Sequence, residues 1–148
     1  RAAAAARHRD DRVTLDMVAT GLDDSPEPLV TRSPELLHGL GNVIQNAVQF
    51  AAAHVSIDIS WDETEARVEV RDDGPGFPPA VLDRIGEPYI SNRKQGHLGL
   101  GIFIAQSLLE RTGARLRFSN SWTSGRTDGA EALITWPRDD LEVAAWEG

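Results

Sequence analysis

The sequence predicts an α+β fold, a two-layer sandwich in which helices pack on a mixed, mostly antiparallel sheet. Two long segments, 35–53 and 100–112, have the composition and helix-type periodicity of helices. About six shorter segments alternate apolar and polar residues as strands do. Short polar turns join neighbouring strand segments, which favours hairpins over the long crossovers of a doubly wound parallel sheet.

Composition excludes several classes of protein. The 148 residues amount to about one domain, and 41% hydrophobic with 26% charged residues is typical of a globular chain. A formal net charge of −8 argues against a nucleic-acid partner, and no apolar run is long enough to cross a bilayer. The absence of cysteine excludes disulfides, thiolate metal sites and a cysteine nucleophile within these residues. With no signal-peptide pattern at the start, we expect an intracellular domain of a longer protein.

The first thirty residues predict one helix and two short strands. Residues 1–12 are rich in alanine and end among arginines, which predicts the end of a helix from an upstream helical region or linker. Alternation over 13–17 predicts a strand, and 29–31 predicts a second small strand after the turn-rich link 21–28.

The helix at 35–53 carries the first candidate site. Ser33 is a cap and Pro34 suits the first helical position. One face is an apolar stripe expected in the core, made of Leu36, Leu37, Leu40, Val43, Ile44, Ala47, Val48 and Ala51. The opposite face carries amides where a solvated face normally carries Lys, Glu and Arg: Asn42, Gln45, Asn46 and Gln49. Amide oxygens can bind a hard cation, although a polar surface without a role remains the alternative.

A glycine-containing loop follows the next pair of strands, which we expect at 55–60 and 66–70. The loop at 72–79 cannot continue as a ladder because it contains Phe77-Pro78-Pro79, so it leaves the sheet. Gly74 and Gly76 let a flat ligand approach the backbone, and a carboxylate at the strand end can accept a hydrogen bond from an exocyclic amine. A plain hairpin turn is the alternative interpretation.

A second glycine-rich run opens the second long helix. A short helix around 80–85 and an irregular segment at 86–99 precede it, and Gly113 is its expected stop. Backbone N–H groups at such a helix start attract phosphate, and Arg93 and Lys94 are close enough in sequence to assist, although two solvated loop charges would look the same. Strands at 115–119 and 131–136 complete the domain, Pro137 ends it, and 138–148 is an acidic tail.

In this order, the segments resemble the catalytic ATP-binding domain of sensor histidine kinases. That domain belongs to the GHKL class, with gyrase-type topoisomerases, Hsp90 chaperones and MutL repair proteins. The resemblance covers residues 13–137 and implies the Bergerat fold, with the helices at 35–53 and 100–112 and an N-terminal helix on one face of the sheet. It also implies ATP and Mg²⁺ as ligands.

The resemblance assigns roles box by box. Residues 40–47 resemble the N box, which implies that Asn46 coordinates Mg²⁺ with Asn42 assisting. Residues 73–76 resemble the G1 box, which implies that Asp73 receives the adenine amino group. Residues 87–89 resemble the F box of the ATP lid, 99–101 the G2 box over the phosphates, and 129–130 the final glycine motif. The remaining residues of the expected nucleotide site are Gln49, Phe50, Gly74, Gly76, Tyr89, Arg93, Lys94, Gly99, Leu100 and Gly101.

Some positions depart from the family pattern. Gln49 stands where a basic residue is usual, His97 where the G2 box usually begins with glycine, and Phe50 where an aromatic side chain can stack on adenine. ATP-hydrolysing members carry a glutamate general base four residues before the metal-binding Asn, and Asn42 occupies that place. An amide cannot take a proton from water at neutral pH, so phosphoryl transfer is expected in place of efficient hydrolysis.

The implied function is that of a histidine protein kinase in a two-component system. The γ-phosphate of ATP would pass to a histidine on a separate dimerisation domain and then to an aspartate of a response regulator. None of the four histidines is assigned as phosphoacceptor, so no catalytic residue is assigned within the chain. Residues 33–42 and 87–91 resemble the redox-responding RegB/PrrB-type kinases of proteobacteria. We expect the cytoplasmic portion of such a kinase, without membrane contact. Two alternatives stay open, a gyrase- or Hsp90-like ATPase and a degenerate nucleotide-binding scaffold.

Overall fold

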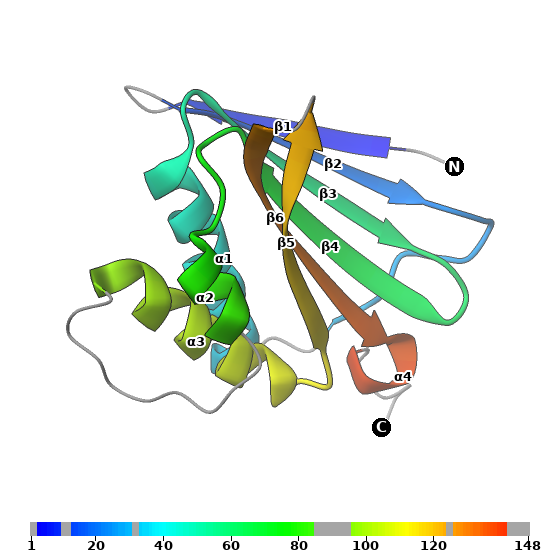
Figure 1. Ribbon diagram of the computed structural model, residues 1–148. Coiled ribbons are helices and arrows are strands. Elements are labelled where there is room, and N and C mark those ends of the chain that lie inside the picture. The colour runs from blue at the N-terminus through cyan, green and yellow to red at the C-terminus, as the bar shows by residue number, and fades with distance from the viewer. Residues whose placement is uncertain (1–2, 10–12, 31–32, 85–95, 124–125, 142–148) are drawn as a thin grey trace.

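The described residues form one six-stranded sheet with helices on one face (Figure 1). The computed structural model describes residues 3–9, 13–30, 33–84, 96–123 and 126–141. The strands are β1 (Ala3–Arg9), β2 (Thr14–Gly21), β3 (His54–Trp61), β4 (Glu65–Asp72), β5 (Arg115–Thr123) and β6 (Arg126–Pro137). The helices are α1 (Pro34–Phe50), α2 (Pro79–Arg84), α3 (Gly96–Glu110) and α4 (Arg138–Leu141). The predicted two-layer α+β sandwich is confirmed.

The strand order is β1-β2-β3-β4-β6-β5, and the pairing is mixed. β2 and β3 run parallel, while every other neighbouring pair is antiparallel. α1 supplies the crossover between β2 and β3, as a parallel connection requires. β3–β4 and β5–β6 are hairpins, as the short polar turns predicted.

The N-terminal segment corrects one prediction. Residues 3–9 form β1, paired antiparallel with β2 from Ala3↔Thr20 to Arg9↔Thr14, where the sequence predicted the end of a helix. The helical preference of alanine is weak, and pairing along β2 satisfies the backbone groups of both strands. The third helix predicted on the face is therefore absent from residues 3–9. Residues 29–30 form no strand either, since Val30 makes only an isolated bridge and Thr31 lies outside the described residues.

α1 begins as predicted and ends earlier. The Ser33 hydroxyl accepts the N–H of Leu36 at 3.1 Å, and Pro34 occupies the first turn. The helix stops at Phe50, where the sequence predicted about Ala53. Its buried positions confirm most of the apolar stripe, but Leu37 is 56% exposed. The buried face is turned toward Gly39, where α3 packs, and this rotation leaves Leu37 at the outer edge.

The contact between α1 and α3 depends on the missing side chain at Gly39. A Cβ added there would lie 2.6 Å from Cγ of Leu109, which is fully buried. We expect Gly39→Ala to destabilise the fold by about 1–3 kcal/mol, because overpacking outweighs the better helix propensity of alanine. Gly41→Ala is the matched control in the same helix, because a Cβ there would meet no atom within 4 Å. Urea unfolding measures both, and equal midpoints for the two variants would contradict this packing.

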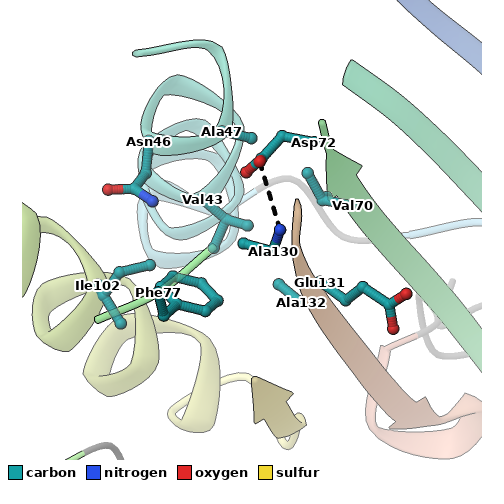
Figure 2. Close-up of a pocket in the computed structure, with 10 residues that line it drawn as sticks. All are labelled: Val43, Asn46, Ala47, Val70, Asp72, Phe77, Ile102, Ala130, Glu131 and Ala132. Carbon is teal, nitrogen blue, oxygen red and sulfur yellow. Dashed lines mark hydrogen bonds between the residues drawn. The ribbon is translucent and has the colours of Figure 1, made fainter. Parts of the chain in front are cut away.

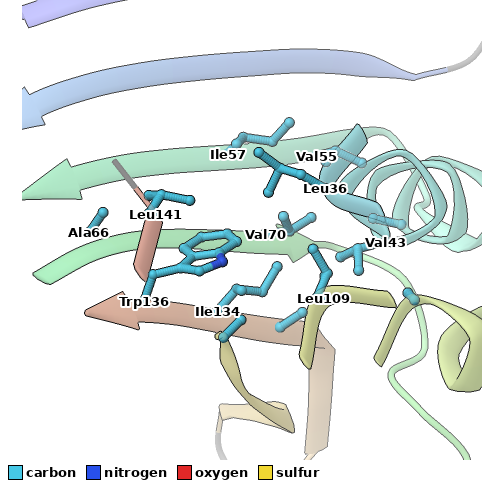
Figure 3. Close-up of a cluster of buried hydrophobic side chains, with 14 of the residues drawn as sticks. Leu36, Val43, Val55, Ile57, Ala66, Val70, Leu109, Ile134, Trp136 and Leu141 are labelled. Atoms are coloured by element: carbon cyan, nitrogen blue, oxygen red, sulfur yellow. The ribbon is translucent and has the colours of Figure 1, made fainter. Parts of the chain in front are cut away.

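The core lies between the sheet and the pair α1 and α3 (Figure 3). Its largest fully buried side chains are Trp136, Leu109, Ile134 and Val55, while the fully buried Ile102 belongs to a smaller cluster with Phe77, Val81 and Ala130. The core also extends beyond the predicted domain end at Pro137. Leu141 of α4 is buried in it, and the guanidinium of the buried Arg138 donates to the carbonyl oxygen of Asp62 at 2.9 Å. Residues 138–141 are therefore part of the folded body, and 142–148 lie outside the described residues.

The second long helix starts at Gly96, before its predicted start at residue 100. Residues 96–99, expected in the irregular segment, form the first turn of α3. At the other end Gly113 has φ +93°, and its N–H donates to the Glu110 carbonyl oxygen at 3.1 Å. Gly113 therefore ends this helix as predicted.

Candidate nucleotide site

A small pocket lies among α1, the end of β4, the loop after it, α3 and β6 (Figure 2). Its lining residues are Val43, Asn46, Ala47, Val70, Asp72, Phe77, Ile102, Ala130, Glu131 and Ala132. An adjoining pocket shares Asn46, Asp72, Phe77 and Ala130 and adds Phe50 and Gly76. Because the two share Asn46 and Asp72, we treat them as one site.

Asp72 is the carboxylate that lines both pockets. Side chains alternate along β4, so Asp72 faces the helices with the core residues Ala66 and Val70. Its Oδ1 accepts the N–H of Gly74 at 2.8 Å and that of Ala130 at 3.3 Å. Burial raises the pKa of Asp72 and outweighs these two bonds, which lower it, and the charge of Asp73 raises it further. A carboxylate has about four acceptor positions, so these two bonds leave capacity for a donor from a ligand.

Asp73, the predicted adenine acceptor, does not line the pocket. Its Oδ1 accepts three consecutive backbone N–H groups, from Ala52 at 2.9 Å, Ala53 at 3.0 Å and His54 at 3.0 Å. Burial alone would raise the pKa of Asp73, but these bonds outweigh it and lower the pKa below its ordinary value. The structure therefore places the neighbouring carboxylate, Asp72, where the sequence interpretation placed Asp73.

Two glycines set how closely the backbone packs around Asp72. A Cβ on Gly74 would lie 2.0 Å from the carbonyl oxygen of Phe50, and a Cβ on Gly129 would lie 1.8 Å from that of Asp72. Gly129 and Gly76 also have positive φ angles, +133° and +85°. The sequence predicted that Gly74 lets a flat ligand approach the backbone. The structure shows instead that it lets the loop pack on the end of α1.

The remaining predicted residues divide into four groups. Asn46 and Phe50 line the site. Asn42 and Gln49 lie on α1 but not among the lining residues. Gly99, Leu100 and Gly101 lie in the first turns of α3, and a Cβ on Gly101 would meet no atom within 4 Å. Tyr89, Arg93 and Lys94, with the rest of the F box, lie outside the described residues.

Sequence reasoning missed the apolar walls, which are Val43, Phe77, Ile102 and Ala130. Asn120 holds Phe77 in place: its Oδ1 accepts the Phe77 N–H at 2.7 Å and its Nδ2 donates to the Phe77 carbonyl oxygen at 3.0 Å. The ring of Phe77 also meets Phe118 edge to face, with centroids 5.8 Å apart. Nothing local in the sequence links residues 77 and 120, so only the fold reveals this wall.

The site combines apolar walls with the Asp72 carboxylate and the Asn46 amide, and the third polar lining residue, Glu131, accepts a hydrogen bond from the Ser121 hydroxyl. Each of the two pockets has a cavity volume of about 10 Å³, room for roughly one water molecule. A purine is larger than either of these cavities. Within the described ranges, no three histidine, aspartate or glutamate side chains come together as a metal site. The described helices also include none long and apolar enough to cross a membrane.

Comparison with protein families identifies this arrangement. The family of histidine kinase-, DNA gyrase B- and HSP90-like ATPases matches residues 31–140. The chain belongs to this family. The match includes both faces of the site, from Asn46 on α1 to Ala130 on β6.

Relatives of this ATPase-family domain are sensor kinases. The sensor histidine kinase RegB of Cereibacter sphaeroides is 40% identical over 152 aligned positions, which cover 91% of this chain and 33% of that protein. The histidine kinase/phosphatase NtrB of Escherichia coli O157:H7 is 40% identical over 109 positions, 60% of this chain and 31% of that protein. The chain thus spans about a third of the length of these relatives. The resemblance to sensor histidine kinases of the RegB type is confirmed.

Solved structures agree on the fold. Full-length ShkA in complex with AMPPNP has a TM-score of 0.62 at 25% identity, covering 88% of this chain and 26% of that one. The mycobacterial sensor histidine kinase MprB has a TM-score of 0.61 at 21% identity, covering 86% of this chain and 84% of that one. The described strands and helices therefore form the fold of a histidine kinase catalytic domain.

Proposed function

We propose that the site binds ATP with Mg²⁺ and that the domain transfers the γ-phosphate to a histidine on a separate dimerisation domain. The observation that carries this proposal is the half-buried Asp72 in an apolar pocket that also contains Asn46. The relationship to RegB and the AMPPNP complex of ShkA support it. Because ATP is an intracellular substrate, we place the domain on the cytoplasmic side.

Asp72, and not Asp73, takes the adenine in this proposal. A carboxylate at the base of an apolar pocket accepts a hydrogen bond from the exocyclic amine of adenine. The walls formed by Val43, Phe77 and Ile102 exclude water from the purine and strengthen that bond. Phe50 stands at the adjoining pocket, where an aromatic ring can stack on the purine.

Asn46 is the proposed metal ligand. Its amide oxygen is a hard ligand of the kind Mg²⁺ accepts, and Mg²⁺ is commonly held by one or two protein oxygens together with phosphates and water. The lack of a carboxylate cluster among the described residues fits a metal that arrives with the nucleotide. When bound, the ion would neutralise charge on the phosphates.

Asn42 favours phosphoryl transfer to an acceptor over hydrolysis of ATP in the proposed reaction. It lies half-buried one turn before Asn46, where ATP-hydrolysing members carry a general base. Since an amide does not accept a proton from water at neutral pH, the chain's own residues position the phosphates without activating water. The acceptor is then a histidine supplied by the dimerisation domain, and an aspartate of a response regulator receives the phosphoryl group from it.

Calorimetry followed by a phosphotransfer assay tests the proposal. We expect the chain to bind Mg-ATP and, with radiolabelled ATP, to phosphorylate a histidine-bearing helical domain supplied in trans. We also expect little release of free phosphate without that acceptor. Steady ATP turnover without an acceptor would favour the ATPase alternative, and the absence of Mg-ATP binding would favour the scaffold.

A further inference from the structure

We propose that Asp73 is a positioning residue that ties the end of α1 to the loop after β4 and thereby places Asp72 for adenine recognition. This inference rests on the proposed function, because it explains how the two elements carrying Asn46 and Asp72 are held in register. Asp73 acts through its neighbours and does not itself line the pocket.

The first observation is the set of groups that Asp73 satisfies. The last helical hydrogen bond of α1 runs from the Ala51 N–H to the Ala47 carbonyl oxygen. The next three N–H groups, from Ala52 to His54, all donate to Oδ1 of Asp73 at 2.9–3.0 Å. The His54 N–H also reaches Oδ2 at 3.1 Å. Successive N–H groups that converge in this way form a concave anion site, and here a carboxylate of the same chain fills it.

The second observation is that three contacts hold the backbone at Asp72. We call the region where residues 50–54, residues 72–74 and Gly129 meet the junction. Asp73 anchors the peptide that follows Asp72 to residues 52–54, where β3 begins. Gly74 packs against the Phe50 carbonyl oxygen, and Gly129 packs against the carbonyl oxygen of Asp72 itself. Phe50 is the last residue of the helix that carries Asn46. The spacing between the amide on α1 and the carboxylate on β4 therefore depends on this junction.

The third observation is that the junction also includes strand β2. The Ala53 carbonyl oxygen accepts the N–H of Thr14 at 2.8 Å, so the segment bound by Asp73 is anchored in the sheet as well. Asp73 thus connects the loop after β4 to a segment that is itself hydrogen-bonded to the sheet. Loss of its carboxylate frees Asp72 and the loop to move relative to α1, while β3 and β4 remain paired from Ser56↔Arg71 to Trp61↔Ala66.

A selectivity measurement separates positioning from plain stabilisation. The affinities for ATP and ITP are compared, because ITP carries a carbonyl where ATP carries the exocyclic amine. We expect the wild-type chain to prefer ATP by about tenfold or more, the worth of one charge-assisted hydrogen bond. Asp73→Ala should reduce this ratio to near one, mainly by weakening ATP. Asp73→Asn, which keeps one acceptor oxygen, should give an intermediate ratio.

A matched control and a fold check complete the test. Asp58→Asn removes another part-exposed carboxylate, which pairs with Arg71 on the outer face of the sheet, and should leave the ratio unchanged. Near-ultraviolet circular dichroism reports whether each variant is folded. A folded Asp73→Ala or Asp73→Asn variant with the wild-type ratio would overturn the inference, and if the alanine variant does not fold, the asparagine variant decides. A wild-type chain without preference for ATP, or an Asp72→Asn variant that keeps it, would instead count against the proposed function.

Discussion

Replacing Asp72 by asparagine is expected to remove selective ATP binding while the domain stays folded. The asparagine oxygen can still accept from Gly74 and Ala130, so the loop keeps its local bonds. The second position of the side chain becomes an NH₂ group, which cannot accept from the adenine amine. Loss of a hydrogen bond to a charged group costs about 1.5–3 kcal/mol, which is roughly a 10- to 150-fold weaker affinity. Calorimetric titration with Mg-ATP measures the change, and wild-type affinity in this variant would refute the assignment.

The same substitution is expected to leave the stability of the fold at pH 7 equal to or higher than that of the wild type. Because burial raises the pKa of Asp72, the ionised carboxylate destabilises the fold at neutral pH, and this penalty disappears as the pH falls through that raised pKa. Asp72→Asn removes the penalty, so its melting temperature at pH 7 should equal or exceed that of the wild type. The difference should shrink at acidic pH. A clear drop in melting temperature at pH 7 would show that the carboxylate is there for stability.

Gly129→Ala is expected to have the largest effect on the fold. A Cβ at this position would lie 1.8 Å from the carbonyl oxygen of Asp72, and φ of +133° is a conformation that side chains rarely adopt. Backbone strain of about 1–3 kcal/mol and overpacking of similar size add up to a large part of a typical domain's stability. The contact is with backbone, so no flexible side chain can move aside. Urea unfolding should show a much lower midpoint, and ATP affinity should fall because Asp72 is displaced.

Gly41→Ala is again the control, since alanine there meets no neighbouring atom. If Gly129→Ala unfolded at the same urea concentration as this control, the close approach of β6 to the end of β4 would be wrong. If Gly129→Ala were destabilised but bound ATP as tightly as the wild type, the placement of Asp72 would not depend on this contact.

The fold was largely predictable because its helices and hairpins have local signals. The Ser33-Pro34 start of α1, the alternation in β3 and β4 and the stop at Gly113 all depend on residues near each other in sequence. The strand at 3–9 was not predictable in this way, because its pairing with β2 is a tertiary interaction that overrides the local preference of alanine. Leu37 was misplaced for a similar reason, since the contact of Gly39 with Leu109 sets the rotation of α1.

The residues of the candidate site likewise divide into those with a local signal in the sequence and those that only the fold brings together. Asn46 could be found because amides are unusual on a helix face. Asp72 could also have been found from the sequence. Residues two apart along a strand share a face, so Asp72 lies on the same face as Val68 and Val70, whereas Asp73 follows the end of the strand. The wall made by Phe77, held by Asn120, joins residues 43 positions apart and has no local signal.

A crystal structure of the chain with Mg²⁺ and a non-hydrolysable ATP analogue would show whether Asn46 and Asp72 together hold Mg-ATP. We expect the adenine amine within hydrogen-bond distance of the Asp72 carboxylate and the Asn46 amide oxygen on the metal. We also expect Asp73 to keep its bonds to residues 52–54. A nucleotide bound elsewhere, or one whose amine contacts Asp73 while Asp72 keeps only its bonds to Gly74 and Ala130, would contradict this expectation.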